Sequence, residues 1–188
     1  MRKDYEIILK LIPENSKVLD IGCSDGELIS YLENKGVSAQ GVELNQEKVI
    51  KCLEKGLDVI HGDINLIVED FPFNQFDYCL LTQTIQAVQK PDKLLNTLKK
   101  VSKNIIVSFN NSARLSKISN FLLSGSFDSL LKKADSDHWY NTDYIHPCSI
   151  KDFKKLAENL DLKIISTFDV INQRKFENGK IPSNLFCK

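Results

Sequence analysis

The chain alternates short apolar runs with amphipathic helical patterns from residue 17 to residue 109, and no other feature restricts its possible folds as strongly. The apolar runs have the length of buried strands and lie at residues 17–21, 37–44, 57–62, 76–82 and 104–109. The helical patterns between them lie at residues 27–36, 46–56 and 91–102. Strands that alternate with helices in this way predict an α/β fold, with a mostly parallel sheet covered by helices on both faces.

Each helical pattern carries a stripe of apolar side chains that should face the sheet. The predicted stripes are Leu28, Ile29 and Leu32, then Val49, Ile50 and Leu53, then Leu94, Leu95, Leu98 and Val101. We expect these side chains to form the helical layers of the hydrophobic core.

The C-terminal part of the chain is organised differently. Residues 148–160 predict a helix capped by Ser149. Residues 162–171 and 183–188 are predicted to pair as a terminal hairpin on the sheet edge, and the polar residues 172–182 between them are predicted to form a loop.

The segment at about residues 110–148 reads as an insertion within a single domain spanning residues 1–188. It contains an amphipathic helix predicted from Arg114 to Leu123. Long excursions of this kind usually have a function, and we expect this one to cover the ligand pocket. Docking of a protein partner on the apolar face of the helix is the alternative.

The composition excludes several classes of protein. The 25 Lys and Arg residues equal the 25 Asp and Glu residues, so no general basic field draws the chain to nucleic acid or to an anionic membrane. The N-terminus does not resemble a secretory signal, and no apolar run reaches the roughly 18 residues of a membrane span. The five cysteines are scattered and favour reduced thiols over disulfides. We therefore expect a cytoplasmic protein.

Three successive predicted strands end in an acidic residue, namely Asp20, Glu43 and, just past the third strand, Asp63. Ligands of open parallel sheets bind beyond the carboxyl ends of the strands, so these carboxylates should line the site. A diphosphate would be repelled there, and the dinucleotide fingerprint fails because Ser24 and Glu27 replace two of its glycines. The pattern favours a cationic nucleoside without phosphates, and S-adenosylmethionine (SAM) has these properties.

A purely structural explanation competes with the binding explanation. Ser24 and Glu27 match an S-x-x-E capping box, which alone would account for the start of a helix. Asp20, Gly22 and Gly26, taken singly, fit a structural role equally well, because glycines are common at strand-to-helix turns. Acids after three successive strands are much harder to explain without a ligand.

The segments VLDIGCSDGEL, GVELN, HGDIN, FDYCLLTQTIQAV and NIIVSF resemble, in order and spacing, the motifs of class I SAM-dependent methyltransferases. The segments LTQTIQAVQKPDKLL, IIVSFNN and WYNTDYIHPCSIKDF resemble the MetW family of methionine biosynthesis proteins. The resemblance implies a Rossmann-like fold with a seven-stranded sheet in the order 3-2-1-4-5-7-6, in which strand 7 is antiparallel. It also implies a role in methionine biosynthesis, where MetW-like proteins are associated with homoserine O-acyltransferase.

The same resemblance assigns roles to individual residues. It implies that the methionine part of SAM is contacted by Asp20, Gly22 and Gly26, the ribose by Glu43, the adenine by Asp63 and Ile64, and the pocket floor by Thr82 and Gln83. Cys23, Ser24 and Leu44 complete the expected cofactor-binding set. Ser24 stands where the family usually has glycine, so a positive φ there would cost about 1 kcal/mol or more.

A catalytic base is harder to identify. Many small-molecule methyltransferases carry a histidine after strand 4, where this chain has Ala87. The remaining candidates are His138, Tyr140, Asp143 and His146, which could also form an aromatic loop packed on a sheet end. Their spacing does not match a metal site.

Two functions from different classes therefore remain open. In the first, the chain transfers a methyl group from SAM to a small-molecule acceptor and releases S-adenosylhomocysteine. In the second, it binds SAM as a partner or regulator of homoserine O-acyltransferase, and the missing base favours this alternative. An NAD-dependent oxidoreductase is disfavoured by the glycine spacing.

Overall fold

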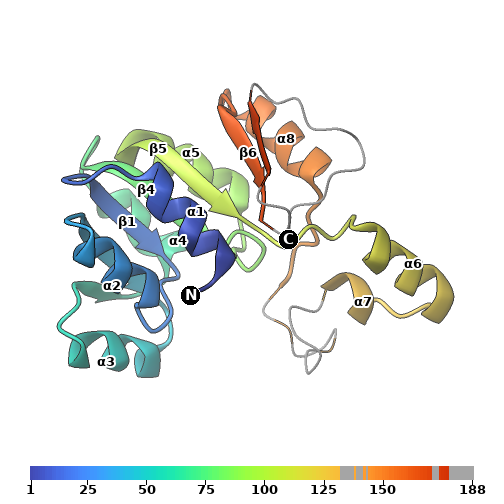
Figure 1. Cartoon of the computed structure of the whole chain (residues 1–188), viewed down its shortest axis with the longest axis horizontal. Helices are drawn as coiled ribbons and strands as arrows, with labels where there is room; N and C mark the ends of the chain where they lie inside the picture. Colours follow the sequence, from blue (N-terminus) through green and yellow to red (C-terminus); the bar gives the residue numbers. More distant parts are fainter. Residues whose placement is uncertain (132–137, 139–141, 143, 171–173, 178–188) are drawn as a thin grey trace. The chain divides into compact units, whose positions relative to one another are not determined.

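The computed structural model describes residues 1–131, 138, 142, 144–170 and 174–177. Their contacts divide the chain into two compact units (Figure 1). The first unit comprises residues 1–85 and 90–108, and the second comprises residues 86–89 and 109–188. Within the described ranges, no helix combines the length and apolar character needed to cross a bilayer.

The first unit is built on a five-stranded parallel sheet in the order β3-β2-β1-β4-β5. Its strands are β1 (Lys17–Ile21), β2 (Ser38–Glu43), β3 (Val59–His61), β4 (Phe76–Thr82) and β5 (Ser102–Ser108). All five predicted strands are confirmed, because buried parallel strands appear in a sequence as continuous apolar runs. The order also confirms the first five strands of the expected topology.

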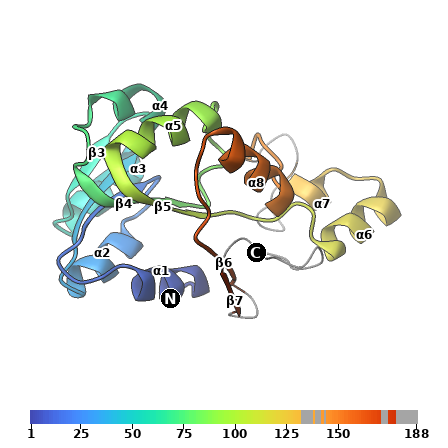
Figure 2. The same ribbon diagram turned by 90° about the horizontal axis from the view of Figure 1, so that it is seen from above.

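Helices cover both faces of this sheet, as predicted. They are α1 (Lys3–Leu11), α2 (Glu27–Asn34), α3 (Gln46–Glu54), α4 (Ile64–Ile67), the short η1 (Val68–Asp70) and α5 (Pro91–Val101). Figure 2 shows α1 and α2 on one side of the sheet and α4 and α5 on the other. The core between α1, α2 and the strands includes Ile12, Val18, Ile29, Leu32 and Leu80, each almost fully buried.

The predicted apolar stripes of α2 and α5 are buried as expected. The stripe predicted for α3 is confirmed at Val49, which is buried, and is wrong at Ile50 and Leu53, which are 48% and 56% exposed. The second buried side chain of this helix is Cys52, which was not predicted. A Cβ on Gly26 would lie 2.3 Å from a methyl group of Leu57 and 3.1 Å from the Cys52 thiol, so the glycine leaves room for both side chains to pack.

The second unit contains α6 (Leu115–Ser124), α7 (Asp128–Leu131), α8 (Ile150–Asn159), β6 (Ser166–Asp169) and β7 (Arg174–Glu177). The predicted helices at 114–123 and 148–160 are both present. At the start of α8, the Ser149 hydroxyl accepts a hydrogen bond from the Asp152 backbone, which confirms the predicted cap.

The two remaining strands pair differently from the prediction. β6 pairs with β7 in an antiparallel two-stranded sheet, in register Thr167↔Phe176. β7 therefore forms inside the segment 172–182, which was predicted to be a loop, and that prediction is wrong. Its polar sequence carries too weak an apolar signal for a strand. The predicted partner strand at 183–188 lies outside the described residues.

The two ends of the insertion lie side by side in the second unit and are hydrogen-bonded to each other, and we call this region the neck. Asn111 and Cys148 form an isolated parallel bridge, and the Ser112 backbone N–H donates to the Cys148 carbonyl at 2.9 Å. The buried side chain of Gln86 joins the two segments of the neck. Its Oε1 accepts from the Asn110 backbone N–H at 2.9 Å, and its Nε2 donates to the His146 carbonyl at 3.3 Å.

Candidate functional site

The turn that joins β1 to α2 has a backbone conformation that favours glycine. Gly22, Ser24 and Gly26 adopt φ values of 73°, 55° and 76°. The turn is fixed to the neighbouring strand, because the N–H groups of Gly22 and Cys23 both donate to the Val42 carbonyl, at 2.8 and 3.2 Å. The positive φ of Ser24 confirms that this serine occupies a position at which glycine is less strained.

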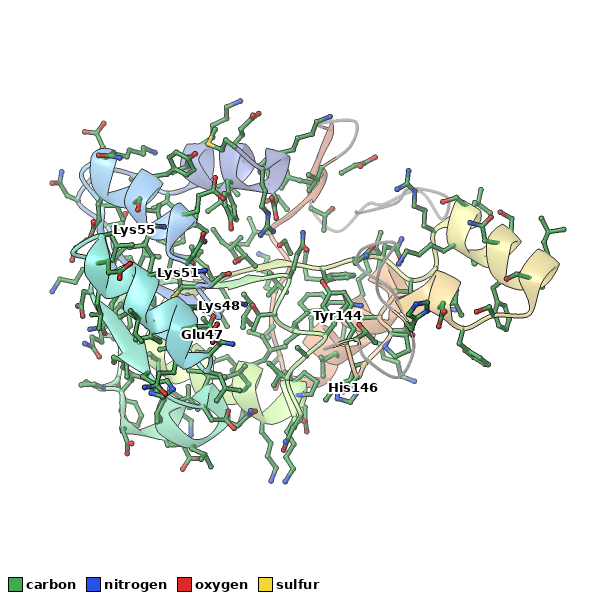
Figure 3. The ribbon with its side chains drawn as sticks, turned by 90° about the horizontal axis from the view of Figure 1, so that it is seen from below. Glu47, Lys48, Lys51, Lys55, Tyr144 and His146 are labelled. Atoms are coloured by element: carbon green, nitrogen blue, oxygen red, sulfur yellow. The ribbon has the colours of Figure 1, made fainter. Side chains whose placement is uncertain are left out.

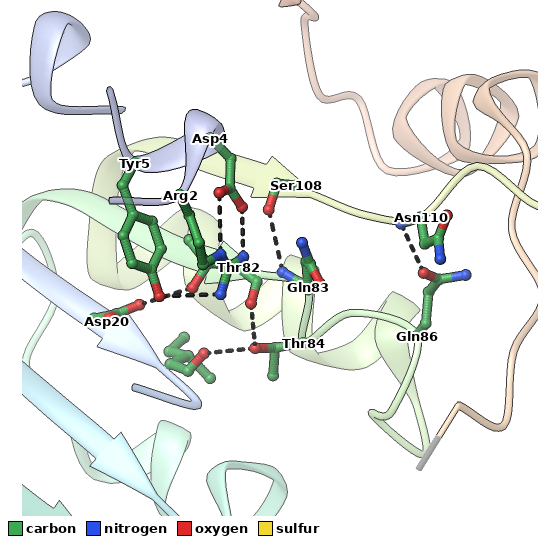
Figure 4. Close-up of polar contacts among 11 residues, drawn as sticks. Arg2, Asp4, Tyr5, Asp20, Thr82, Gln83, Thr84, Gln86, Ser108 and Asn110 are labelled. Carbon is green, nitrogen blue, oxygen red and sulfur yellow. Dashed lines mark hydrogen bonds and ion pairs between the residues drawn. The ribbon is translucent and has the colours of Figure 1, made fainter. Parts of the chain in front are cut away.

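Position 22 needs a glycine for a steric reason as well as for its positive φ. A Cβ at this position would lie only 2.7 Å from the Thr84 hydroxyl oxygen and 2.9 Å from its methyl group. Thr84 follows β4, and its hydroxyl donates to the carbonyl of Ile21 at 2.9 Å (Figure 4). Thr84 thus closes the turn from the side of β4. The sequence analysis did not single it out, because its role depends on a contact between segments far apart in the chain.

Glu43 connects the turn to the end of β2. Its Oε2 accepts a hydrogen bond from the Ser24 backbone N–H at 2.8 Å, and its Oε1 accepts from the Asn45 N–H at 2.9 Å. The capping-box explanation of Ser24 and Glu27 is wrong, since α2 is preceded by Gly26 and has no side-chain cap. Each carboxylate oxygen has two lone pairs, so Glu43 retains acceptor capacity for ligand hydroxyls.

Asp20 has the most deeply buried carboxylate among the residues that the structure describes. Its side chain is only 1% exposed, and Oδ2 has no hydrogen-bond partner among the described residues. Oδ1 accepts a long hydrogen bond of 3.5 Å from the Thr82 hydroxyl. Burial raises the pKa of Asp20 to about 7, and the Glu43 charge adds to this, while the Thr82 hydrogen bond and the Arg2 charge oppose it. A buried acceptor without a partner is costly and suits a cationic donor from a ligand.

At the end of β3, Asp63 has a clear local role. Its Oδ1 accepts from the backbone N–H of Asn65 at 2.9 Å and from the Asn65 side chain at 2.7 Å, so it caps α4. Ile64 is buried next to it. Leu44, which follows Glu43, is 66% exposed, and its carbonyl lies 3.0 Å from Nε2 of His61. The structure brings Asp20, Glu43 and the turn together, whereas the contacts of Asp63 are local.

The end of β4 carries the two residues predicted for the pocket floor. Thr82 is buried beside Asp20, as described above. Gln83 has a φ of 60°, and its backbone N–H donates to both the carbonyl and the hydroxyl of Ser108, at 2.9 and 3.2 Å (Figure 4). A non-glycine residue with this φ stores strain, and such strain is concentrated at functional sites.

The N-terminal segment contributes a cation that the sequence analysis missed. Arg2 donates from Nε to Asp4 at 3.1 Å and from Nη1 to the Tyr5 hydroxyl at 3.0 Å (Figure 4). Its charge lowers the pKa of Asp20. Burial raises the pKa of Tyr5 to about 12, the Arg2 charge opposes this shift, and the Asp20 charge adds to it. A single arginine near the start of a chain gives no local sequence signal, because its position depends on how α1 packs.

Lys55, which follows α3 and is labelled in Figure 3, contacts the turn between β1 and α2. Its ammonium group donates to the Asp25 carbonyl at 2.6 Å. The Asp25 carboxylate is 4.0 Å away, and both side chains are about half exposed. An exposed pair of this kind contributes little to stability.

The candidate bases belong to the second unit. Nδ1 of His138 lies 3.1 Å from a carboxylate oxygen of Asp128. Nε2 of His146 lies 3.3 Å from the Gln89 carbonyl (Figure 3). Tyr140 and Asp143 lie outside the described residues. Among the residues that are described, no group of three or more His, Cys, Asp or Glu side chains is placed to hold a metal ion.

Comparison with known families gives one clear match. Residues 2–188 match the family model described as methionine biosynthesis protein MetW. A relative from Rhodopirellula baltica, described as a bifunctional methionine biosynthesis protein MetXA/MetW, is 32% identical over 191 residues. The match covers 96% of this chain but only 30% of the relative.

Solved structures with a similar fold include a SAM-dependent methyltransferase from Archaeoglobus fulgidus. It is 19% identical, with a TM-score of 0.64, and the match covers 88% of this chain and 72% of that one. The [4+2]-cyclase SpnF is 16% identical, with a TM-score of 0.65 and coverage of 91% and 61%. Because these proteins differ in their described activity, the similarity shows the fold and leaves the chemistry to be argued from the site.

Proposed function

The chain belongs to the MetW family of methionine biosynthesis proteins and has a methyltransferase-like fold, and from this we propose that it binds SAM at the turn after β1. The observation that carries this proposal is the buried carboxylate of Asp20, whose Oδ2 has no partner among the described residues. The methionine part of SAM supplies both an ammonium and a sulfonium. Either cation would stabilise the ionised form of Asp20.

The geometry of the first unit supports the remaining contacts of this proposal. Glu43 accepts the ribose hydroxyls with the lone pairs that the two backbone N–H groups leave available. The exposed side chain of Leu44 offers an apolar surface for the adenine ring, and Asp63 accepts from its exocyclic amine. Gly22, Cys23, Ser24 and Gly26 let the backbone approach the ligand, and Thr82 and Gln83 form the pocket floor.

Isothermal titration of the purified chain with SAM and S-adenosylhomocysteine tests this proposal. We expect both to bind with a Kd in the micromolar range, equivalent to about −8 kcal/mol. NADH serves as the control, because a dinucleotide would place its phosphates against Asp20 and Glu43. Binding of NADH with no binding of SAM would contradict the proposal.

The biological role that we propose is that of a partner or regulator of homoserine O-acyltransferase, as the MetW resemblance implies. The bifunctional relative supports this role, since its name joins MetXA to MetW in one chain. This chain spans less than a third of the length of that relative. Co-purification of the two proteins, followed by acyltransferase assays with and without SAM, tests the role. Acyltransferase activity that is the same with and without this chain would contradict it.

Methyl transfer to a small-molecule acceptor is the second candidate function. One observation favours it: the Asp128 carboxylate holds Nδ1 of His138, an arrangement that can orient the other ring nitrogen as a base. Incubation with methyl-labelled SAM and a panel of small acceptors tests this candidate. Transfer that is lost in His138→Ala and retained in Lys103→Gln would support it.

A further inference from the structure

The N-terminal helix holds its first residues in a fixed place on the sheet. Tyr5, Ile8 and Ile12 are buried in the core of the first unit. The ammonium group of Lys35, which follows α2, donates to the carbonyls of Leu9 and Ile12 at the other end of α1. The helix is therefore attached at both ends, and the residue that precedes it cannot move far.

Arg2 is held in turn by the first residues of this helix. Its Nε and Nη2 donate to the two carboxylate oxygens of Asp4, at 3.1 and 2.5 Å. Its Nη1 donates to the Tyr5 hydroxyl, and its Cζ lies 4.4 Å from the centre of the Tyr5 ring. A guanidinium paired in this way and stacked on an aromatic ring loses little further freedom when it binds a ligand.

The fixed guanidinium faces the buried carboxylate of β1. Its charge lowers the pKa of Asp20, whereas the Glu43 charge raises it. Figure 4 shows the side chains of Arg2 and Asp20 in the same region, near the Tyr5 hydroxyl to which Arg2 donates. The Arg2 side chain is 36% exposed, so a ligand can reach it. The Arg2 guanidinium and the Asp20 carboxyl therefore lie close enough at the carboxyl end of β1 for their charges to interact.

We infer that Arg2 binds the α-carboxylate of the ligand and so completes a subsite for an α-amino-acid zwitterion, whose ammonium the proposed function already places at Asp20. A guanidinium has five N–H donors in a planar fork and can serve more than one carboxylate. Arg2 is the one arginine among residues 1–108 of the sequence. The inference rests on the proposed function, since SAM and S-adenosylhomocysteine carry this zwitterion at their methionine end.

A purely structural role of Arg2 makes a different prediction. If Arg2 serves only to pair with Asp4 and stack on Tyr5, its loss would destabilise α1 and weaken every ligand to the same extent. If Arg2 binds the ligand carboxylate, its loss would weaken only ligands that have one. Decarboxylated SAM separates these cases, because it keeps the nucleoside, the sulfonium and the ammonium but lacks the carboxylate.

The experiment is a titration of wild type, Arg2→Gln and Arg2→Lys with SAM and with decarboxylated SAM. Any affinity tag is placed at the C-terminus, so that the segment before Arg2 is the same in each protein. Lys103→Gln is the control, because it removes one positive charge at an exposed ion pair with Asp77 at the amino ends of β4 and β5.

We expect wild type and Lys103→Gln to prefer SAM over decarboxylated SAM by about 10- to 100-fold, the range of a charge-assisted hydrogen-bond pair. Arg2→Gln should lose most of this preference while binding decarboxylated SAM as wild type does. Arg2→Lys, which keeps the charge without the fork, should show an intermediate preference and covers the case in which Arg2→Gln does not fold. A preference unchanged by either substitution, or an equal loss of affinity for both ligands, would overturn the inference while the proposed function, SAM binding by wild type, still stood. Wild type that binds neither ligand would instead overturn the proposed function, and the subsite with it.

Discussion

The backbone N–H of Ser24 donates a hydrogen bond to Oε2 of Glu43 at 2.8 Å, so the last residue of β2 fixes the turn that follows β1. The other oxygen of the same carboxylate holds Asn45 at the start of α3. A single buried side chain therefore orders the loops after two neighbouring strands. Its contribution to ligand binding includes this ordering as well as any direct contact with a ribose.

Glu43→Gln should weaken SAM binding by about 10- to 100-fold, because glutamine offers one acceptor oxygen where two backbone N–H groups now have one each. The thermal unfolding temperature should also fall. Glu47→Gln, which changes an exposed glutamate in the first turn of α3, is the matched control and should change neither quantity. Titration calorimetry and thermal unfolding measure the two effects. Unchanged affinity in Glu43→Gln would show that this carboxylate neither contacts the ligand nor orders its loop.

Ser24→Gly should raise the free energy of unfolding by up to about 1 kcal/mol, because glycine adopts the φ of 55° without strain. Affinity for SAM should be unchanged or higher. Asn15→Gly relaxes a similar φ of 61° in the loop between α1 and β1, and should leave affinity unchanged. Chemical denaturation and calorimetry measure both variants. A marked loss of affinity in Ser24→Gly would mean that the serine side chain itself contacts the ligand.

Gly22→Ala should be much more harmful than Gly36→Ala, although both residues have a positive φ. A Cβ on Gly36 meets nothing within 4 Å, so that substitution costs only the backbone strain of about 1 kcal/mol. A Cβ on Gly22 also meets Thr84 at 2.7 Å, and the turn must shift. Denaturant unfolding should separate the two variants, and only Gly22→Ala should lose SAM binding. Equal effects would contradict the described fit between the turn and Thr84.

Ionisation of Asp20 should lower the free energy of unfolding and raise the affinity for SAM. Its folded pKa of about 7 lies above the ordinary value of 3.8 for this carboxyl, so the fold favours the neutral form. Relative to Asp20→Asn, the free energy of unfolding of wild type should therefore fall as pH rises from about 4 to about 7 and then level off. Affinity for SAM should rise over the upper part of this range, because a cationic ligand favours the ionised carboxylate.

The charged and titratable groups around Asp20 are Arg2 and Tyr5 from the N-terminal segment, Cys23 from the turn and Glu43 from β2. The comparison with Asp20→Asn isolates Asp20 from them. Urea unfolding and SAM titration at a series of pH values make the measurement. A binding profile equally steep in Asp20→Asn would assign the pH dependence to another group.

The predictable parts of the fold are those in which a local pattern determines the structure. β1 and β4 were predicted to the residue because a fully buried strand leaves an unbroken apolar run. α3 was predicted as a helix with Val49 buried, but the burial of Cys52 was not predicted, because Gly26, which leaves room for Cys52 and Leu57, lies on a different segment. β7 was missed since a polar strand paired on one side has almost no sequence signal.

The predictable part of the site is similarly limited. The positions of Asp20, Glu43 and Asp63 at one edge of the sheet could be predicted, because the carboxyl ends of parallel strands meet there. The positive φ of Ser24 could be predicted because the family usually has glycine at this position. Thr84 and Arg2 could not be found, because each acts through a partner distant in the sequence. Their positions depend on tertiary packing, which no short motif encodes.

The closed neck at Gln86, Asn110 and Cys148 has an evolutionary consequence. Because the excursion leaves and rejoins the unit at one place, its length can change for only a small loop-closure entropy, on the order of 0.6 kcal/mol for each doubling. The residues between Ser112 and Cys148 can therefore be exchanged together, as one cassette, without a change to the contacts that join the two ends. A lineage could therefore replace this cassette to suit a new acceptor or partner while the acids at the strand ends stay where they are.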